Sequence, residues 1–211
     1  MESLYPASMM AGMTPLHETR LDQVLRRLKG SGARRVLDLG CGAGHLLYRL
    51  ARERQFEAIV GLESCTHSLL LARNLLSGYL DDASQRLSLI SSSYTEAQPS
   101  LCGYDAAAMV ETIEHLKPGA LSAAEQVVFG QMRPRVVYVT TPNREYNSLY
   151  GLSPGQLREA DHEFEWDRDR FCLWSQGIAR RNGYRVMMGG IGDHDPEFGQ
   201  PTQTAFFIRQ E

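Results

Sequence analysis

The chain has 211 residues, of which 43% are hydrophobic and 22% are charged. These proportions are ordinary for a globular protein, and the length suits one large domain with a core of its own. The net charge of −3 excludes a broad basic surface that would bind long nucleic acids nonspecifically. The net charge does not exclude a site that binds only the end of a nucleic-acid strand.

The cysteines are scattered and form no C-x-x-C pair: Cys41, Cys65, Cys102 and Cys172. This pattern argues against a disulfide framework and a thiolate zinc site, and it predicts a reducing, cytoplasmic location. Residues 1–13 contain Met9, Met10 and Met13 but no continuous apolar run, which predicts neither a signal peptide nor a membrane span. We expect a flexible tail over residues 1–13 and one domain over residues 14–211.

Hydrophobic periodicity predicts alternating helices and strands. In chain order these are a helix at Leu16–Lys29, a strand at Val36–Leu39, a helix around Leu46–Leu50, a strand at Ala58–Leu62, a helix at Leu69–Leu80, strands at Leu87–Ile90 and Ala106–Val110, a helix at Ser122–Met132, a strand at Val136–Thr140, a helix at Arg170–Arg181, and strands at Val186–Met188 and Ala205–Ile208. This order predicts a doubly wound α/β fold with a mostly parallel, seven-stranded sheet and an antiparallel C-terminal strand. Ligands bind such sheets beyond the carboxyl ends of the strands.

A glycine-rich loop, Asp38–Gly44, follows the first predicted strand and opens a helix. Gly40 and Gly42 allow the backbone amides to approach a ligand closely. The acid Asp38 precedes the first glycine, and His45 stands where a dinucleotide-binding loop has glycine. The loop therefore resembles one that binds S-adenosylmethionine more than one that holds a pyrophosphate.

Polar residues end the next two predicted strands. Glu63 lies where a carboxylate can accept hydrogen bonds from both hydroxyls of a ribose, although a solvated charge would also suit that position. Ser93 closes a run of three serines that could face an adenine edge or form a plain polar turn. The residues alone do not decide between these alternatives.

Carboxylates and imidazoles form a second group of candidate ligands. Glu111, Glu114 and His115 are spaced to share one face of a helical turn, and His162 follows later in the chain. Two carboxylates with two histidines suit Mg²⁺, Mn²⁺ or Fe²⁺ better than a metal that prefers thiolates. The alternative is an acidic helix start with a chance histidine, and a loop His162 capped by Asp161. The other histidines are interpreted as ordinary surface or core residues: His17, His45, His67 and His194.

Five segments in this order carry a family resemblance: Pro15–Leu16 with Arg20, Asp38–Gly42, Glu111–His115, Thr141–Asn143 and Asp161–Trp166. Over about residues 14–210 the chain resembles the Hua-enhancer family, which methylates the 2′-hydroxyl at the 3′ end of small RNAs. The resemblance implies a Rossmann-like class I methyltransferase domain that uses S-adenosylmethionine and either Mg²⁺ or Mn²⁺.

The resemblance also implies a role for each matching residue. The cofactor residues would be Asp38, Gly40, Gly42 and Gly44 around the pocket, Glu63 at the ribose and Ser93 at the adenine. The metal ligands, which form the catalytic group, would be Glu111, Glu114, His115 and His162. Apart from the resemblance, candidate substrate contacts are Arg20, Asn143, Arg144 and Arg158. The arginines would contact RNA phosphates or, equally, have ordinary structural roles. Phe164 and Trp166 would stack on RNA or brace His162.

The expected substrate is an RNA 3′ end with free 2′- and 3′-hydroxyls, because four protein ligands leave two positions on an octahedral ion for these adjacent oxygens. The RNA would be a small RNA or a repaired RNA, and a protein of either pathway is an expected partner. Two other readings stay open: a metal-dependent O-methyltransferase for small diols, and a cofactor-binding subunit without turnover.

Overall fold

The computed structural model describes residues 13–82 and 85–210. Nearly all of the predicted N-terminal tail lies outside these residues. None of the helices in the described ranges is long and apolar enough to cross a membrane.

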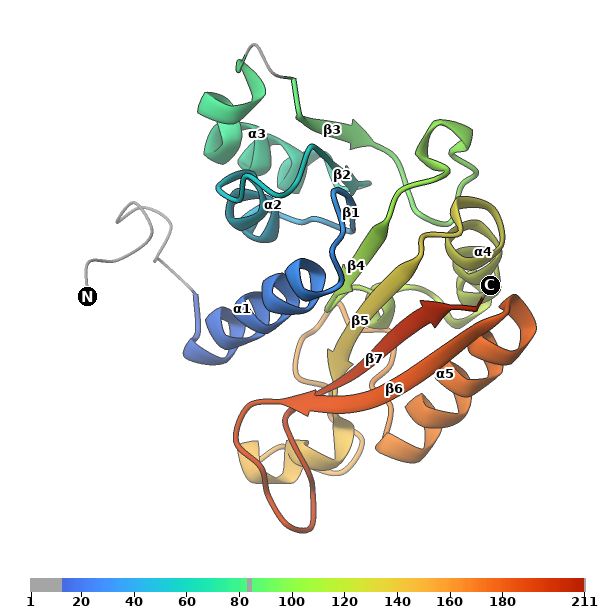
Figure 1. The fold of residues 1–211 in the computed structure, drawn as a ribbon. Helices are drawn as coiled ribbons and strands as arrows, with labels where there is room; N and C mark the ends of the chain where they lie inside the picture. Colours follow the sequence, from blue (N-terminus) through green and yellow to red (C-terminus); the bar gives the residue numbers. More distant parts are fainter. Residues whose placement is uncertain (1–12, 83–84, 211) are drawn as a thin grey trace.

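The sheet has seven strands in the order β3-β2-β1-β4-β5-β7-β6 (Figure 1). Their bounds are β1 Arg35–Leu39, β2 Ala58–Glu63, β3 Leu87–Ser91, β4 Ala106–Val110, β5 Val136–Pro142, β6 Tyr184–Ile191 and β7 Thr202–Arg209. Strands β1 to β5 pair in parallel, and β7 runs antiparallel to both β5 and β6. The predicted fold class is confirmed, and β6 extends beyond the predicted Val186–Met188.

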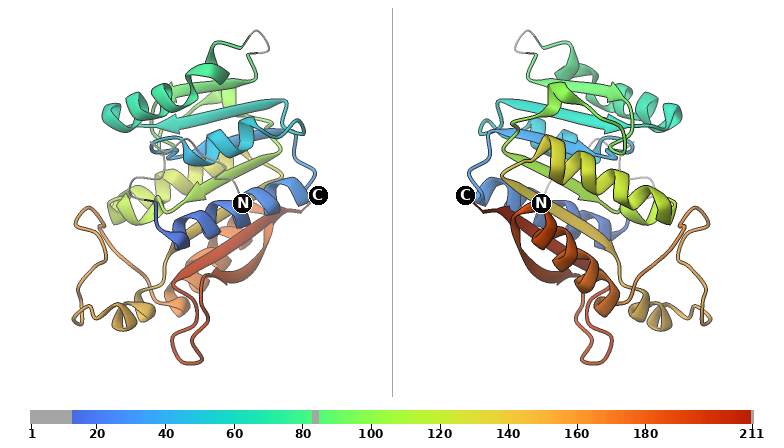
Figure 2. Two further views of the ribbon diagram at one scale, coloured as in Figure 1. Left: turned by 90° about the vertical axis from the view of Figure 1, so that its left-hand side faces the viewer. Right: turned by 90° about the vertical axis from the view of Figure 1, so that its right-hand side faces the viewer.

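Helices cover both faces of the sheet. Figure 2 shows α1 (Pro15–Gly30), α2 (His45–Ala51) and α3 (Thr66–Leu80) on one face, and α4 (Leu121–Glu125) and α5 (Arg168–Asn182) on the other. Alternate residues of a strand enter opposite cores, as expected for a pleated backbone. Val36 of β1 packs with α1 and α2, whereas Leu37 packs on the side of α5.

The predicted helix Ser122–Met132 is present, but its second half is a π-helix, Gln126–Met132. The wider turn brings Val127 and Met132, five positions apart, into the same core beside Phe129. The π-helix ends at Arg133, which has a left-handed backbone with φ of +47°.

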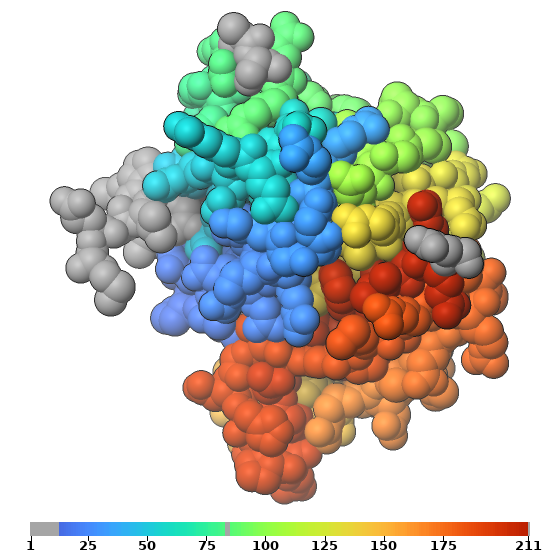
Figure 3. Space-filling view, in the orientation of Figure 1, coloured from blue at the N-terminus to red at the C-terminus, as the bar shows by residue number. Residues whose placement is uncertain are grey.

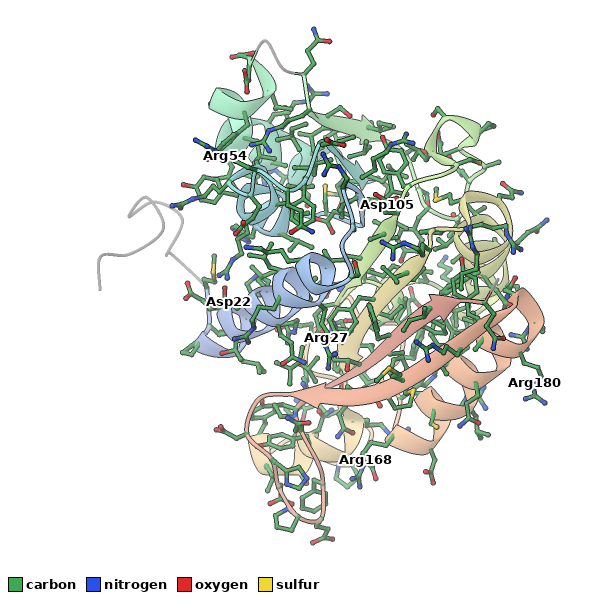
Figure 4. All side chains as sticks on the ribbon, in the orientation of Figure 1. Asp22, Arg27, Arg54, Asp105, Arg168 and Arg180 are labelled. Atoms are coloured by element: carbon green, nitrogen blue, oxygen red, sulfur yellow. The ribbon has the colours of Figure 1, made fainter. Side chains whose placement is uncertain are left out.

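Two connections at the carboxyl edge of the sheet position the candidate site. The β5–α5 connection (residues 143–167) contains a 3-10 helix, Arg144–Tyr150, and its ends are paired by a bridge between Asn143 and Trp166. The β6–β7 loop (residues 192–201) projects as a lobe at the bottom of Figure 3. Arg168, labelled in Figure 4, donates to the Glu145 carboxylate at 2.6 Å and to the Glu197 carbonyl at 2.8 Å. It therefore ties the two connections together.

Candidate active site

A cavity of about 400 Å³ lies beside the glycine loop, between the carboxyl ends of β1, β2 and β4. We call it the glycine-loop cavity. Four of the residues predicted to bind the cofactor line it: Gly40, Gly42, Glu63 and Ser93. These residues lie at or just after the carboxyl ends of β1, β2 and β3, which the parallel sheet brings together at one edge.

Glu63 connects the glycine loop to the loop before α3. Its Oε2 accepts a hydrogen bond from the Gly42 amide at 2.8 Å, and its Oε1 accepts one from the Cys65 amide at 2.7 Å. Each carboxylate oxygen has a second lone pair. The carboxylate is thus held at the cavity wall and can still accept hydroxyl donors from a ligand.

The glycines of the loop meet different requirements. Gly40 has φ of +79°, and a Cβ there would lie 2.3 Å from Thr112 Oγ1. The backbone therefore passes too close to Thr112, just after β4, to leave room for a side chain. Gly44 has φ of +85° and would place a Cβ 3.1 Å from that of Ala72 on α3. Gly44 therefore packs against a helix and does not line the cavity as predicted.

Asp38 also lies outside the lining of the glycine-loop cavity. Its side chain is buried within β1, and its Oδ2 has no hydrogen-bond partner among the described residues. Burial, followed by the charge of Glu63, raises the pKa of Asp38 to about 7. This acid lies beneath the loop and bears an unsatisfied polar atom.

Glu114, His115 and His162 form what we call the acid–histidine cluster. One ligand atom from each lies within 4.8 Å of the others, although His162 follows His115 by 47 positions. The two imidazole rings meet edge to face with centroids 4.9 Å apart. The Glu163 amide donates to the Glu114 carbonyl at 2.8 Å, which fixes the two distant segments against each other.

Glu114 is fully buried, and this placement suits a cation. Thr141 Oγ1 donates to Oε2 at 3.0 Å, whereas Oε1 is buried without any partner among the described residues. Burial, followed by the charge of Glu111, raises the pKa of Glu114 well above its usual value. A buried carboxylate oxygen without a partner is costly, and a divalent ion held by oxygen and imidazole ligands would satisfy it. The residues present therefore fit the metal that the resemblance implies.

His162 is oriented by Glu165, which the sequence analysis missed. The His162 Nδ1 lies 2.6 Å from Glu165 Oε1, leaving Nε2 for a ligand. Burial acts to raise the pKa of Glu165, but hydrogen bonds from His162, from Asn147 at 2.6 Å and from the Arg158 amide at 2.8 Å outweigh it and lower the pKa. A carboxylate that holds a ligating histidine in this way is common around metals. The H-x-x-E spacing within residues 162–165 was the available signal.

Glu111 is placed differently from the prediction. It precedes the 3-10 helix Ile113–His115 and has φ of +48°, so the expected shared face of one helical turn is wrong. Its carboxylate accepts from Thr140 Oγ1 at 2.8 Å and pairs with Arg20 Nη2 at 3.1 Å. It lies beside the cluster, and its role as a fourth ligand stays a prediction.

A second cavity, of about 590 Å³, lies on the other side of these residues, next to the start of α1. We call it the α1 cavity. It shares Glu111, His115 and Asp161 with the glycine-loop cavity. The two cavities therefore meet at these three residues, of which His115 belongs to the acid–histidine cluster.

The predicted substrate contacts are occupied within the protein. Arg20 is buried and donates to Thr202 Oγ1 at 3.0 Å besides pairing with Glu111. Arg158 lines the α1 cavity but donates to the Pro201 carbonyl at 2.8 Å and to Asn147 Oδ1 at 2.6 Å. Both guanidinium groups support the walls of the site through these bonds, and a contact of either with an RNA phosphate stays a prediction.

Asn143 and Arg144 lie outside the α1 cavity, and their predicted substrate role stays a prediction. Asn143 is buried and donates to the carbonyls of Phe198 and Gln200 at 2.8 and 2.9 Å. Arg144 pairs with Asp167 on the surface at 2.7 Å. Both residues anchor the β5–α5 connection.

Phe164 and Trp166 stack on each other with ring centroids 4.4 Å apart. Trp166 also contacts Trp174 of α5, with centroids at 5.4 Å. Neither ring lines the α1 cavity. Of the two predicted roles, the structure favours bracing of the segment that carries His162.

Comparisons with known proteins show which family the chain belongs to. A family model described as a methyltransferase domain matches residues 31–133. The small RNA 2′-O-methyltransferase of Gallus gallus is 32% identical over 207 residues, which cover 93% of this chain and 54% of that protein. The chain thus spans about half the length of the curated relative. The structure of the protein known as small RNA methyltransferase HEN1 superposes with a TM-score of 0.86 at 28% identity, covering 100% of this chain and 27% of that one.

The methyltransferase domain of a bacterial Hen1 is 40% identical, with a TM-score of 0.84. The match covers 93% of this chain and 100% of that domain. The chain therefore belongs to the Hen1, or Hua-enhancer, family of methyltransferase domains.

Proposed function

We propose that this domain transfers the methyl group of S-adenosylmethionine to the 2′-hydroxyl of the 3′-terminal nucleotide of an RNA. The observation that carries the proposal is the meeting of two cavities at Glu111, His115 and Asp161. Methyl transfer needs the hydroxyl and the methyl group in contact and aligned. A cofactor in one cavity and a ribose in the other would meet at this shared wall.

The glycine-loop cavity is the proposed cofactor site. The amides around Gly40 and Gly42 would approach the amino-acid part of S-adenosylmethionine, and Glu63 would accept hydrogen bonds from its ribose hydroxyls. Ser93 lies at the adenine side in this assignment. Asp38 would act beneath the loop, where a nearby cationic cofactor favours its charged form.

The acid–histidine cluster, with Glu111, is the proposed site of Mg²⁺ or Mn²⁺. When bound, such an ion lowers the pKa of an oxygen ligand and so makes a ribose hydroxyl a better nucleophile. Glu114 supplies a buried negative charge, and Glu165 holds the ring of His162 in one orientation. Arg20 and Thr140 hold the carboxylate of Glu111 at the wall between the cavities.

The proposed substrate class is RNA with free 2′- and 3′-hydroxyls at its end, from small-RNA protection or from RNA repair. The relatives named small RNA 2′-O-methyltransferases support the RNA part of the proposal. The α1 cavity, of about 590 Å³, has room for the terminal nucleotide. A protein of the same pathway would then deliver the RNA, since the domain would grip little beyond the end.

The test is transfer of labelled methyl from S-adenosylmethionine to short RNAs that differ only in the last ribose. With Mn²⁺ present, a 2′,3′-diol end should react and a 2′-deoxy end should not, because the latter has no nucleophile. A 3′-deoxy end should react about 10²-fold more slowly if the lost contact is worth roughly 3 kcal/mol. A chelator should abolish the reaction.

Three results would overturn parts of this proposal. Equal rates on the diol and 3′-deoxy ends would remove the requirement for both hydroxyls. Faster methylation of a catechol than of any RNA would indicate a small-molecule O-methyltransferase. Binding of S-adenosylmethionine without turnover on any substrate would indicate a non-catalytic subunit.

A further inference from the structure

Two histidines outside the proposed metal site face the α1 cavity. His17 lies in the first turn of α1, where the Oγ1 of the N-cap residue Thr14 accepts a hydrogen bond from its amide at 3.2 Å. His45 is the first residue of α2, directly after the left-handed Gly44. Their rings meet edge to face with centroids 5.7 Å apart. From the sequence, both are interpreted as ordinary surface or core residues, and their shared position at the cavity wall sets them apart as what we call the imidazole pair.

Burial favours the uncharged form of both rings of the imidazole pair. Burial, followed by the charges of Arg20, His45 and Arg49, lowers the pKa of His17 to about 4. Burial and the charge of Arg49 also lower the pKa of His45. The pair therefore offers neutral aromatic surface and does not compete with the proposed ion for negative charge.

The ring of His17 has a defined tautomer. Arg20 Nη1 lies 3.4 Å from His17 Nδ1, and a guanidinium group can only donate, so Nδ1 is the acceptor. A neutral imidazole that accepts at Nδ1 carries its hydrogen on Nε2. The pair thus combines aromatic faces with an N–H donor. Arg20 also pairs with Glu111, so it fixes the position of His17 relative to that carboxylate.

The α1 cavity therefore has two chemically distinct parts. One is the charged group around Glu111 and His115, and the other is the imidazole pair. Tyr150 adds another ring to the lining, with the guanidinium of Arg158 over it at 5.0 Å. A ligand that suits both parts has a polar hydroxylated end joined to a flat, uncharged heterocycle with hydrogen-bond acceptors. A nucleoside has this composition, and unstacked RNA bases are commonly held on aromatic side chains, including histidine.

We propose that His17 and His45 form a contact surface for the base of the terminal nucleotide while its ribose lies at the acid–histidine cluster. This inference rests on the proposed function and adds the residues that hold the base. Stacking depends on the π-face that every base has, so the contact should tolerate all four bases. It should strengthen RNA binding without contributing to the methyl-transfer step.

The experiment combines changes in the protein with removal of the base from the RNA. The dissociation constant is measured by fluorescence anisotropy for an RNA with a normal 3′ nucleotide and for one with an abasic 3′ ribose, both with free hydroxyls. Mn²⁺ and S-adenosylhomocysteine are present. For the unchanged protein, loss of the base should weaken binding roughly tenfold or more.

The double variant His17→Ala, His45→Ala should bind the normal RNA about as weakly as the unchanged protein binds the abasic RNA, and should bind the abasic RNA no worse. His45→Phe keeps an aromatic face and should retain most of the affinity. His67→Ala removes an exposed histidine of α3, outside the lining of the α1 cavity, and should change neither constant. The abasic RNA also controls for a disturbance of Arg20, which would weaken binding of both RNAs equally.

Equal weakening of both RNAs by the double variant, or no weakening of either, would overturn the inference. A lower single-turnover rate at saturating RNA, with unchanged affinity, would instead assign the pair to proton transfer and would also overturn it. The proposed function is tested separately by methyl transfer from the unchanged protein. The two experiments can therefore reveal an active enzyme without the base contact. They can also reveal base-dependent RNA binding without methyl transfer.

Discussion

The two halves of the candidate site are built in different ways. The glycine-loop cavity is made largely by backbone, with Gly40 and Gly42 in left-handed conformations and Glu63 bonded to main-chain amides. The acid–histidine cluster is made by side chains from segments 47 positions apart. Two of these side chains are held by further side chains, Glu114 by Thr141 and His162 by Glu165. Changes in the first half should therefore disturb the fold and the cofactor together, whereas changes in the second should remove chemistry and leave the fold intact.

The largest effect on activity is expected for Glu114→Gln. The amide keeps the volume of the side chain but removes the charge that the proposed ion requires, so methyl transfer should fall about 10³-fold. The melting temperature without metal should not fall, because a buried carboxylate oxygen without a partner is replaced by a neutral group. Unchanged Mn²⁺-dependent activity would show that the cluster is not the metal site.

Gly40→Ala should have the next largest effect, and it acts on the fold. The added Cβ would lie 2.3 Å from Thr112 Oγ1 on a backbone with φ of +79°. Strain and overpacking together should lower the free energy of unfolding by about 3 kcal/mol and weaken cofactor binding. Both quantities can be measured on one sample by urea denaturation and calorimetric titration.

Gly42→Ala is the matched control for Gly40. Gly42 also has a positive φ, of +53°, but no described atom lies within 4 Å of the position of its Cβ. Only conformational strain of about 1 kcal/mol should remain there. Equal losses at the two glycines would mean that close approach to Thr112 is unimportant.

Glu165→Ala should lower the affinity for Mn²⁺ by about 10- to 100-fold, because His162 would lose the partner that fixes its ring. Glu165→Gln can still accept from His162 Nδ1, so it should restore part of the loss. The neighbouring Glu163→Ala is the control, since its side chain is exposed and only its main-chain amide contacts Glu114. Titration of each variant with Mn²⁺, followed by paramagnetic resonance, measures the difference directly.

The sequence predicted the half of the site that is local. The loop at Gly40 and Gly42 can be recognised from adjacent residues, and periodicity in continuous apolar strands predicted the sheet. The left-handed backbone of Glu111 could not be predicted, because it depends on Thr140 of the neighbouring strand and on Arg20 of α1. The prediction from residue spacing assumed a regular helical turn, whereas the chain forms a short 3-10 helix there.

The contacts that sequence reasoning missed are those between elements far apart in the chain. His17 and His45 carry no pattern that relates them, and only the packing of α1 beside α2 brings their rings together. Arg20 and Arg158 were interpreted as candidate substrate contacts, and the sequence alone did not reveal that both make internal hydrogen bonds. Burial of a charged side chain is set by tertiary packing, which residue type does not reveal.

The smallest effect, on the free energy of unfolding, is expected for Asp38. It tests the comparison between the two halves of the site most directly, because Asp38 acts through its side chain in the half that is built mainly by backbone. Its pKa is raised from 3.8 to about 7, chiefly by burial. The folded protein therefore binds a proton that the unfolded chain releases above about pH 4, and stability should fall as the pH rises through 7. Between pH 6.5 and 8.5 the contribution of Asp38 to the free energy of unfolding should decrease by about 1 kcal/mol. In Asp38→Asn the amide stays neutral, so this part of the pH dependence should disappear.

The difference in the pH dependence of unfolding between the unchanged protein and Asp38→Asn isolates the titration of Asp38 from that of other groups. Glu114, whose pKa is also raised, contributes in the same direction in both proteins, and the lowered pKa of His17 acts mainly below pH 6.5. Urea denaturation at pH 6.5 and pH 8.5, without cofactor, measures the difference. S-adenosylmethionine carries positive charge and should favour the ionised Asp38, so saturating cofactor should flatten the pH dependence of the unchanged protein. Identical pH profiles for the two proteins would mean that Asp38 is already ionised at pH 6.5. Its unpartnered oxygen would then be solvated in the folded protein, and the glycine loop would rest on backbone geometry alone.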